Sequence, residues 1–204
     1  WHVTIDFFFF FVQYARNFWK TERLPDGWEL VDCTMLPKKG DLKLPKNWRS
    51  IMKIVIPQKV ILNIINGRLT TISESLPHEA QCGFRPFRGC IDAIFNVRLS
   101  LKKRQEHNLE SWPIFVDFVK AFDRVPRGML WKVLAKLGVP KKVVCLLVEI
   151  HNKVTVRISE GDEKTTINST NGVRQGCILG PILFLFYVCA IKMSWDKQRT
   201  GDNC

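Results

Sequence analysis

The chain has 204 residues and a formal net charge of +12, from 31 Lys and Arg against 19 Asp and Glu. Its hydrophobic fraction (46%) and charged fraction (25%) are ordinary for a globular protein and exclude a disordered or collagenous chain. The basic excess indicates a polyanionic partner, with nucleic acid first and an acidic membrane surface second. Seven cysteines without a CxxC pair favour reduced thiols. We therefore expect an intracellular chain of about one domain, in nucleus or cytoplasm, not secreted and without a membrane partner.

The first half of the chain predicts three helices and one strand. Bulky apolar residues over 7–20 predict a helix, and the alternation in Glu29–Pro37 predicts a strand that ends in a basic turn. Apolar residues spaced by three and four after Pro57 predict a second helix. A loop is expected over 76–89. A third helix follows over 91–107, with one apolar face and a basic C-terminal end.

A short apolar run over 112–118 contains one carboxylate, Asp117, and predicts a buried strand. Burying a carboxylate in such a strand costs several kcal/mol of folding free energy unless it is paired or binds a metal. We therefore expect a cation near Asp117. The alternative is an aspartate that caps the next turn. Asp123 is expected to cap a helix or to pair with the flanking Arg124 or Arg127.

The second half predicts three helices and a hairpin. Residues 126–137 form a helix with Met129 and Leu130 among its inward side chains, and Gly138 ends it. Another helix covers 141–151, and strands near 154–158 and 164–167 form a hairpin. The last helix, over 182–195, is apolar on nearly all sides, so part of it is expected to be exposed.

Four sequence blocks, in order, resemble those of reverse transcriptases from non-LTR (LINE-type) retrotransposons. FVDFVKAFDRVPRGMLWKVL (115–134) resembles the first catalytic block of the palm, and NGVRQGCILGPILF (171–184) resembles the second. NWRSI (47–51) and QCGFRPFRGCIDAIF (81–95) resemble two blocks of the fingers. The resemblance covers about residues 16–190.

This resemblance implies an α+β fold, with the fingers and a partial palm of a right-hand polymerase and an antiparallel palm sheet backed by helices. Residues 1–27 would be a helical lead-in, 28–110 a fingers-like region and 111–204 the partial palm. The downstream [FY]-A-D-D block of the family is not found after Phe184, and Gly180 replaces the usual Ser. We expect self-association through the palm edge that this leaves open.

The resemblance assigns roles to individual residues. Asp117 matches the aspartate that bridges two Mg²⁺ ions, and Phe118 the position whose backbone carbonyl reaches the second ion. Phe122 matches an aromatic steric gate against a 2′-hydroxyl, although simple core packing would also explain a Phe there. Arg49 and Arg85 match cations that hold the incoming triphosphate.

The second palm block completes the expected site. Gln175 and Gly176 match the loop that lies against the nascent base pair, so Asp117 and Gln175 are expected in one cleft. A basic group near the third helix is expected to bind the RNA template and the DNA primer, with a solvated basic face as the alternative. It comprises Arg88, Arg98, Lys102, Lys103 and Arg104.

Two functions follow from these residues. The resemblance implies RNA-directed DNA polymerase activity, that is, template-directed deoxynucleotide transfer, in the complete enzyme. The missing carboxylate block makes us expect the 204 residues to be inactive on their own. The alternative is a non-catalytic remnant that binds RNA or DNA through a basic cleft.

Overall fold

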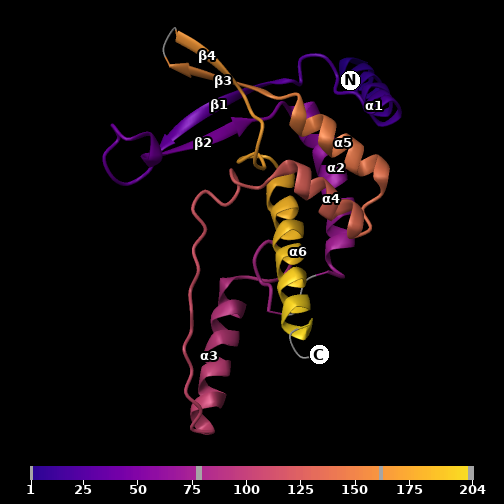
Figure 1. The fold of residues 1–204 in the computed structure, drawn as a ribbon. Helices are drawn as coiled ribbons and strands as arrows, with labels where there is room; N and C mark the ends of the chain where they lie inside the picture. The colour runs from indigo at the N-terminus through magenta and orange to yellow at the C-terminus, as the bar shows by residue number, and fades with distance from the viewer. Residues whose placement is uncertain (1, 77–79, 161–162, 202–204) are drawn as a thin grey trace.

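The computed structural model describes residues 2–76, 80–160 and 163–201, which combine helices with one sheet and confirm the α+β class (Figure 1). The helices are α1 (His2–Thr21), α2 (Ile56–Ser73), α3 (Cys90–Glu106), α4 (Arg127–Lys136), α5 (Lys141–Asn152) and α6 (Leu179–Gly201). The strands are β1 (Leu30–Pro37), β2 (Trp48–Lys53), β3 (Thr155–Glu160) and β4 (Glu163–Asn168). All six predicted helices, the predicted first strand and the hairpin are confirmed.

The four strands form one mixed sheet in the order β2-β1-β3-β4. The β1–β2 and β3–β4 pairs are antiparallel, as expected, but β1 and β3 are parallel, with Cys33 opposite Ile158. The β3–β4 pair is a hairpin, and a tight turn requires antiparallel strands. A long helical segment separates β2 from β3, so β3 can pair with β1 in the parallel direction. Val31 and Cys33 of β1 pack with Val154 and Val156 in a small apolar cluster on one face.

The main core lies among α2, α4, α5 and α6, where Leu62, Leu130, Leu146 and Leu183 are fully buried. Side chains from each of the three predicted regions contribute to this one core, and the predicted boundaries between those regions stay predictions. The expectation that Met129 points inward was wrong, because it is 56% exposed. The buried stripe of α4 runs through positions 127, 130 and 134, and Met129 lies one residue off it.

Helix α6 is the most apolar helix of the core, and its buried residues all lie in its first half. By length and composition, Leu179–Gln198 could cross a bilayer, although no single apolar run predicts this. In the structure this helix packs against α2 and α4. Its outer end exposes Ile191 and Trp195, as expected from the sequence.

Residues 112–118 do not form the predicted buried strand. They are irregular, and Trp112 and Phe115 are 85% and 84% exposed. A strand needs a neighbour for its N–H and C=O groups, and in the described residues no strand pairs with this segment. Helix α3, which precedes it, stands away from the core, and its predicted apolar face, including Ile91 and Ile94, is exposed (Figure 1). An apolar pattern predicts a face that can be buried but not what covers it.

Candidate functional site

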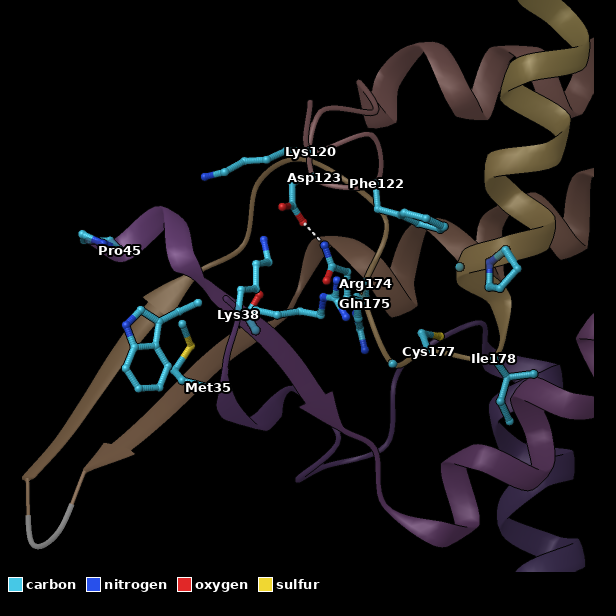
Figure 2. Close-up of a pocket in the computed structure, with 16 residues that line it drawn as sticks. Met35, Lys38, Pro45, Lys120, Phe122, Asp123, Arg174, Gln175, Cys177 and Ile178 are labelled. Carbon is cyan, nitrogen blue, oxygen red and sulfur yellow. Dashed lines mark hydrogen bonds between the residues drawn. The ribbon is translucent and has the colours of Figure 1, made fainter. Parts of the chain in front are cut away.

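A groove of about 720 Å³ opens where three distant segments meet: the start of β2, the turn at 120–123 and the loop at 174–181 (Figure 2). Lys38, Arg49 and Lys120 line it, and each of these side chains is exposed. Asp123 is the acidic residue among the described side chains that line it. The groove therefore carries a net positive charge and suits an anionic ligand.

Backbone hydrogen bonds hold the Gly/Gln loop between the sheet and the 122–125 turn. The Met52 N–H donates to the Gln175 carbonyl (3.0 Å), and the Val173 N–H donates to the Phe122 carbonyl (2.9 Å). The side chain of Gln175 donates from Nε2 to Asp123 Oδ1 (3.2 Å), as Figure 2 shows. These contacts place the Gln175 amide in the groove.

Two glycines make this close approach sterically feasible. Gly172 and Gly176 have φ values of +78° and +93°, in the region that favours glycine. A Cβ at Gly172 would lie 2.7 Å from the Asp123 carbonyl oxygen, and one at Gly176 2.8 Å from that of Met52. Both ends of the loop therefore touch backbone that a larger residue would displace.

Arg127 anchors the same loop through hydrogen bonds to its backbone. The expected pairing of Arg127 with Asp123 is not found in the described residues. The Arg127 Nε donates to the Gly172 carbonyl (2.8 Å), and its Nη1 donates to the carbonyls of His151 (2.7 Å) and Ser169 (2.5 Å). Nη2 donates to Ser169 Oγ (2.8 Å), and the residue is only 4% exposed. A buried guanidinium satisfies its donors on carbonyls when these are the groups within reach.

A buried histidine lies beside Arg127 and Arg174. Burial, with Arg174 nearby, lowers the pKa of His151 to about 3, while burial lowers the pKa of Arg174 to about 10. His151 is therefore neutral at pH 7, and its Nδ1 is 2.8 Å from the Leu147 carbonyl, which requires the proton on Nδ1. Arg174 also lines the groove, whereas His151 is fully buried, so this layer supports the loop and adds positive charge beside the groove.

Phe122 belongs both to the groove and to the core, so the two interpretations of this residue are compatible. Its ring lines the groove and stacks on Phe184 of α6, with centroids 4.9 Å apart and planes at 27°. Phe84, from the loop before α3, meets it edge-on at 5.8 Å. The ring is thus fixed from two sides.

The structure brings together some of the predicted site residues. Arg49, Phe122, Gln175 and Gly176 all line the groove. Arg85 is half-buried outside the lining set, and its Nη1 donates to the Gln81 carbonyl (3.1 Å). The sequence interpretation did not assign Lys38 to the site, although the basic turn after β1 gave a signal for it.

Asp117 and Phe118 lie outside the lining set, in the exposed segment before the 120–123 turn. Asp117 was expected in one cleft with Gln175, but the aspartate that lines this groove and bonds Gln175 is Asp123. Asp123 does not cap α4 either, since the N-cap of that helix is Pro126. Spacing along the chain could not distinguish two aspartates six residues apart when the segment between them is irregular.

The basic residues near α3 form a separate exposed surface. Arg98, Lys102, Lys103 and Arg104 lie on α3, and Arg88 just precedes it. Arg104 Nη2 donates to the Glu110 carbonyl (2.8 Å), which ties the return segment to the helix. The Arg104 guanidinium Nε also contacts Ser111 Oγ. This surface is available to a polyanion and does not border the groove.

The described residues do not assemble a site that fits two metal ions. In 2–76, 80–160 and 163–201, no group of three or more His, Cys, Asp or Glu side chains comes together in a way that could hold one. Asp117 is exposed, and Asp123 is engaged with Gln175. A two-ion centre needs several carboxylates within reach of both ions.

Comparison with known protein families identifies the family of this chain. The family model described as reverse transcriptase (RNA-dependent DNA polymerase) matches residues 36–203. The chain belongs to the reverse transcriptase family. The match spans β2, β3, β4 and helices α2 to α6, and it includes every groove-lining residue except Met35.

Its relatives are proteins of non-LTR retrotransposons, as the sequence blocks predict. The Pol polyprotein of type-1 retrotransposable element R2 from Popillia japonica is 29% identical over 83% of this chain and 24% of its own length. An uncharacterized 149 kDa protein of transposon TX1 from Xenopus laevis is 29% identical over 98% of this chain and 16% of its own length. The chain thus spans less than a quarter of the length of these two relatives and is a reverse transcriptase domain of a LINE-type element.

The fold is similar to that of a solved right-hand polymerase. An apo telomerase from Candida tropicalis, truncated from its C-terminal domain, matches with a TM-score of 0.57 at 11% identity. The match covers 84% of this chain and 40% of the telomerase chain. At this identity the similarity supports the fold alone and carries no information about the reaction.

Proposed function

We propose that the groove binds the incoming deoxynucleoside triphosphate during template-directed DNA synthesis by a retrotransposon reverse transcriptase. The observation that carries the proposal is the meeting of Arg49, Phe122 and Gln175 in one positively charged groove. These residues come from three separate sequence blocks, and the resemblance of each block to the family assigns each residue a nucleotide contact.

The charges of the groove fit a triphosphate. Lys38, Arg49 and Lys120 supply cations at its rim, and Arg49 offers forked donors for phosphate oxygens. Asp123 is bonded to Gln175, which reduces its repulsion of an anion. We infer that the phosphates lie toward Arg49 and that the sugar lies toward the Phe122 ring.

Gln175 is suited to lie against the nascent base pair. Its Nε2 is engaged by Asp123, which leaves Oε1 as an acceptor at the groove. Gly176 adds no side chain between the loop and a bound base. We propose that Asp123 orients the Gln175 amide, so that the pair acts as one unit.

Asp117 remains the proposed metal-binding and catalytic residue by resemblance, with the Phe118 carbonyl beside it. Reverse transcriptases use divalent metal ions, which activate the primer hydroxyl and neutralise the leaving pyrophosphate. The described residues do not fit two ions, so we derive no step through them. The proposed partners are an RNA template and a DNA primer on the α3 surface, in nucleus or cytoplasm.

A second function is favoured because Asp117 is not among the side chains that line the groove, and because no group of three or more His, Cys, Asp or Glu side chains in the described residues could hold a metal ion. In that case the domain is a non-catalytic remnant that binds RNA or DNA through its basic surfaces. Both functions predict nucleic-acid binding, and only the first predicts chemistry that depends on Asp117.

Primer extension separates the two functions. The purified chain is incubated with a primed RNA template and deoxynucleotides, in Mg²⁺ and in Mn²⁺, beside Asp117→Ala and the exposed control Asp26→Ala. Extension that is lost in Asp117→Ala and kept in Asp26→Ala supports the polymerase. Salt-sensitive RNA binding without extension supports the remnant.

A further inference from the structure

Two aromatic side chains contact the Phe122 ring, and the backbone of Gly180 also lies beside it. Phe184 stacks on one face of the ring, and the Phe84 ring meets both partners nearly at right angles, at 5.8 Å from Phe122 and 6.1 Å from Phe184. A Cβ at Gly180, if present, would lie 3.8 Å from Phe122 Cε1. Among the described residues, Phe84 and Phe184 are thus the aromatic contacts of the Phe122 ring.

Phe84 reaches this position through an uncommon backbone conformation. Its φ is +59°, in the left-handed region that bulky residues rarely adopt. The loop around it is braced by hydrogen bonds from Gln81 Nε2 to the Gly83 carbonyl (3.2 Å) and from Arg85 Nη1 to the Gln81 carbonyl (3.1 Å). Such strained residues persist where their surroundings compensate for them, and they cluster at functional sites.

Packing in the core does not explain the strained backbone of Phe84. Its side chain is 49% exposed, whereas Phe184 is part of the packing around α6. The Phe84 ring contacts Phe122, an aromatic side chain that lines the groove, and Phe184, which stacks on Phe122. The contact is therefore better explained by the position of Phe122 than by stability.

We propose that Phe84 is a positioning residue that holds the Phe122 ring in place and thereby sets how strongly the groove rejects a 2′-hydroxyl. The proposal rests on the proposed function, because it assumes that the sugar lies against Phe122. With Phe84 present, the ring cannot swing away from the groove without losing an edge-on aromatic contact. With Phe84 removed, the ring keeps its stacking on Phe184 but loses the edge-on contact, and a ribose is accommodated at lower cost.

The loop contains its own matched control. Phe87 lies three residues on, also with a positive φ (+57°), and its side chain is fully exposed. Phe87→Ala therefore removes the same side chain from the same kind of backbone without touching the groove. Phe84→Tyr keeps the ring and can place its hydroxyl in solvent, so it should behave as the wild type.

The test measures binding of 2-aminopurine deoxyribonucleoside triphosphate and of its ribonucleoside counterpart by fluorescence, with a primed RNA template present. The two probes differ only at the 2′ position, so the ratio of their affinities reports sugar discrimination. We expect Phe84→Ala to lower this ratio by about 2- to 10-fold, the range that an aromatic pair contributes. Phe84→Tyr and Phe87→Ala should leave it unchanged.

The outcomes are distinct. A fall in both affinities by the same factor in Phe84→Ala, with the ratio kept, means a merely structural role and overturns the inference. An unchanged ratio with unchanged affinities overturns it as well, while the nucleotide site stands. If the wild type binds neither probe, the proposed function itself fails.

Discussion

Replacing Arg127 by Met should strongly destabilise the domain and loosen the loop that carries Gln175. The Arg127 guanidinium donates to three backbone carbonyls and one hydroxyl, on the 169–172 segment and at the end of α5. Met fills a similar volume but donates nothing. The variant therefore tests whether these hydrogen bonds anchor the loop.

The magnitude follows from the groups left without partners. An unsatisfied buried polar group costs about 1–3 kcal/mol, and Gly172, His151 and Ser169 each lose the Arg127 donor. Removing a buried guanidinium returns part of this, because its own desolvation is costly. We expect a net loss of about 3 kcal/mol. Arg127→Lys should recover little of it, because a single ammonium cannot reproduce the fork.

Urea unfolding followed by circular dichroism measures this free energy, with Arg124→Met as the control. Arg124 is exposed on the same segment, so its replacement should change stability by less than about 0.5 kcal/mol. Equal stabilities for Arg127→Met and the wild type would refute the anchoring role.

Four further predictions concern pH, backbone, nucleic acid and association. Because burial lowers the pKa of His151 to about 3, well below its unfolded value of about 6.5, stability should be complete above pH 6.5 and fall by up to about 1.4 kcal/mol per unit toward pH 3. His151→Gln should flatten this slope in pH-dependent unfolding. Gly172→Ala should disrupt the loop and lower the melting temperature. Gly128→Ala, with open space on α4, should raise the free energy of unfolding by about 0.5–1 kcal/mol. RNA affinity in filter binding should fall steeply with salt, and charge removal at 102–104 should weaken the dependence. Light scattering should show association through the exposed 112–119 segment.

Specific results would contradict each of these. A pH slope in His151→Gln equal to that of the wild type would mean that other groups cause it. Gly172→Ala with an unchanged melting temperature would remove the steric argument for that glycine. RNA binding that does not respond to salt would exclude the α3 surface as its main determinant. A clean monomer at micromolar concentration would show that the apolar segment is not an interface between copies.

The helices were predictable because each carries a periodic apolar stripe with a clear stop, such as Gly138 after α4. The sequence blocks assigned Arg49, Gln175 and Gly176 to one site, and the three residues do line one groove, while their roles there stay predictions. The parallel pairing of β1 with β3 was not predictable, since no local pattern specifies which distant strand will be its neighbour.

The remaining errors share one physical cause. The apolar run around Asp117 predicts burial, but burial depends on a partner strand that local sequence does not reveal. Arg127 was expected as a possible ion-pair partner of Asp123, but it donates to backbone carbonyls of distant segments, a contact that has no signature in the sequence. The left-handed φ of Phe84 could not be predicted from the sequence either, because Phe rarely adopts this conformation.

Photoaffinity labelling with 8-azido-dATP, in the presence of a primed RNA template, tests the central claim most directly. The label should map by mass spectrometry to peptides covering β2 and the 172–178 loop, and unlabelled dATP should compete for it. The chain offers a rival, an apolar groove of about 860 Å³ between α1 and α2 that includes Phe10 and Ile64. Label confined to that groove, or spread without competition, would contradict the assignment of the nucleotide site.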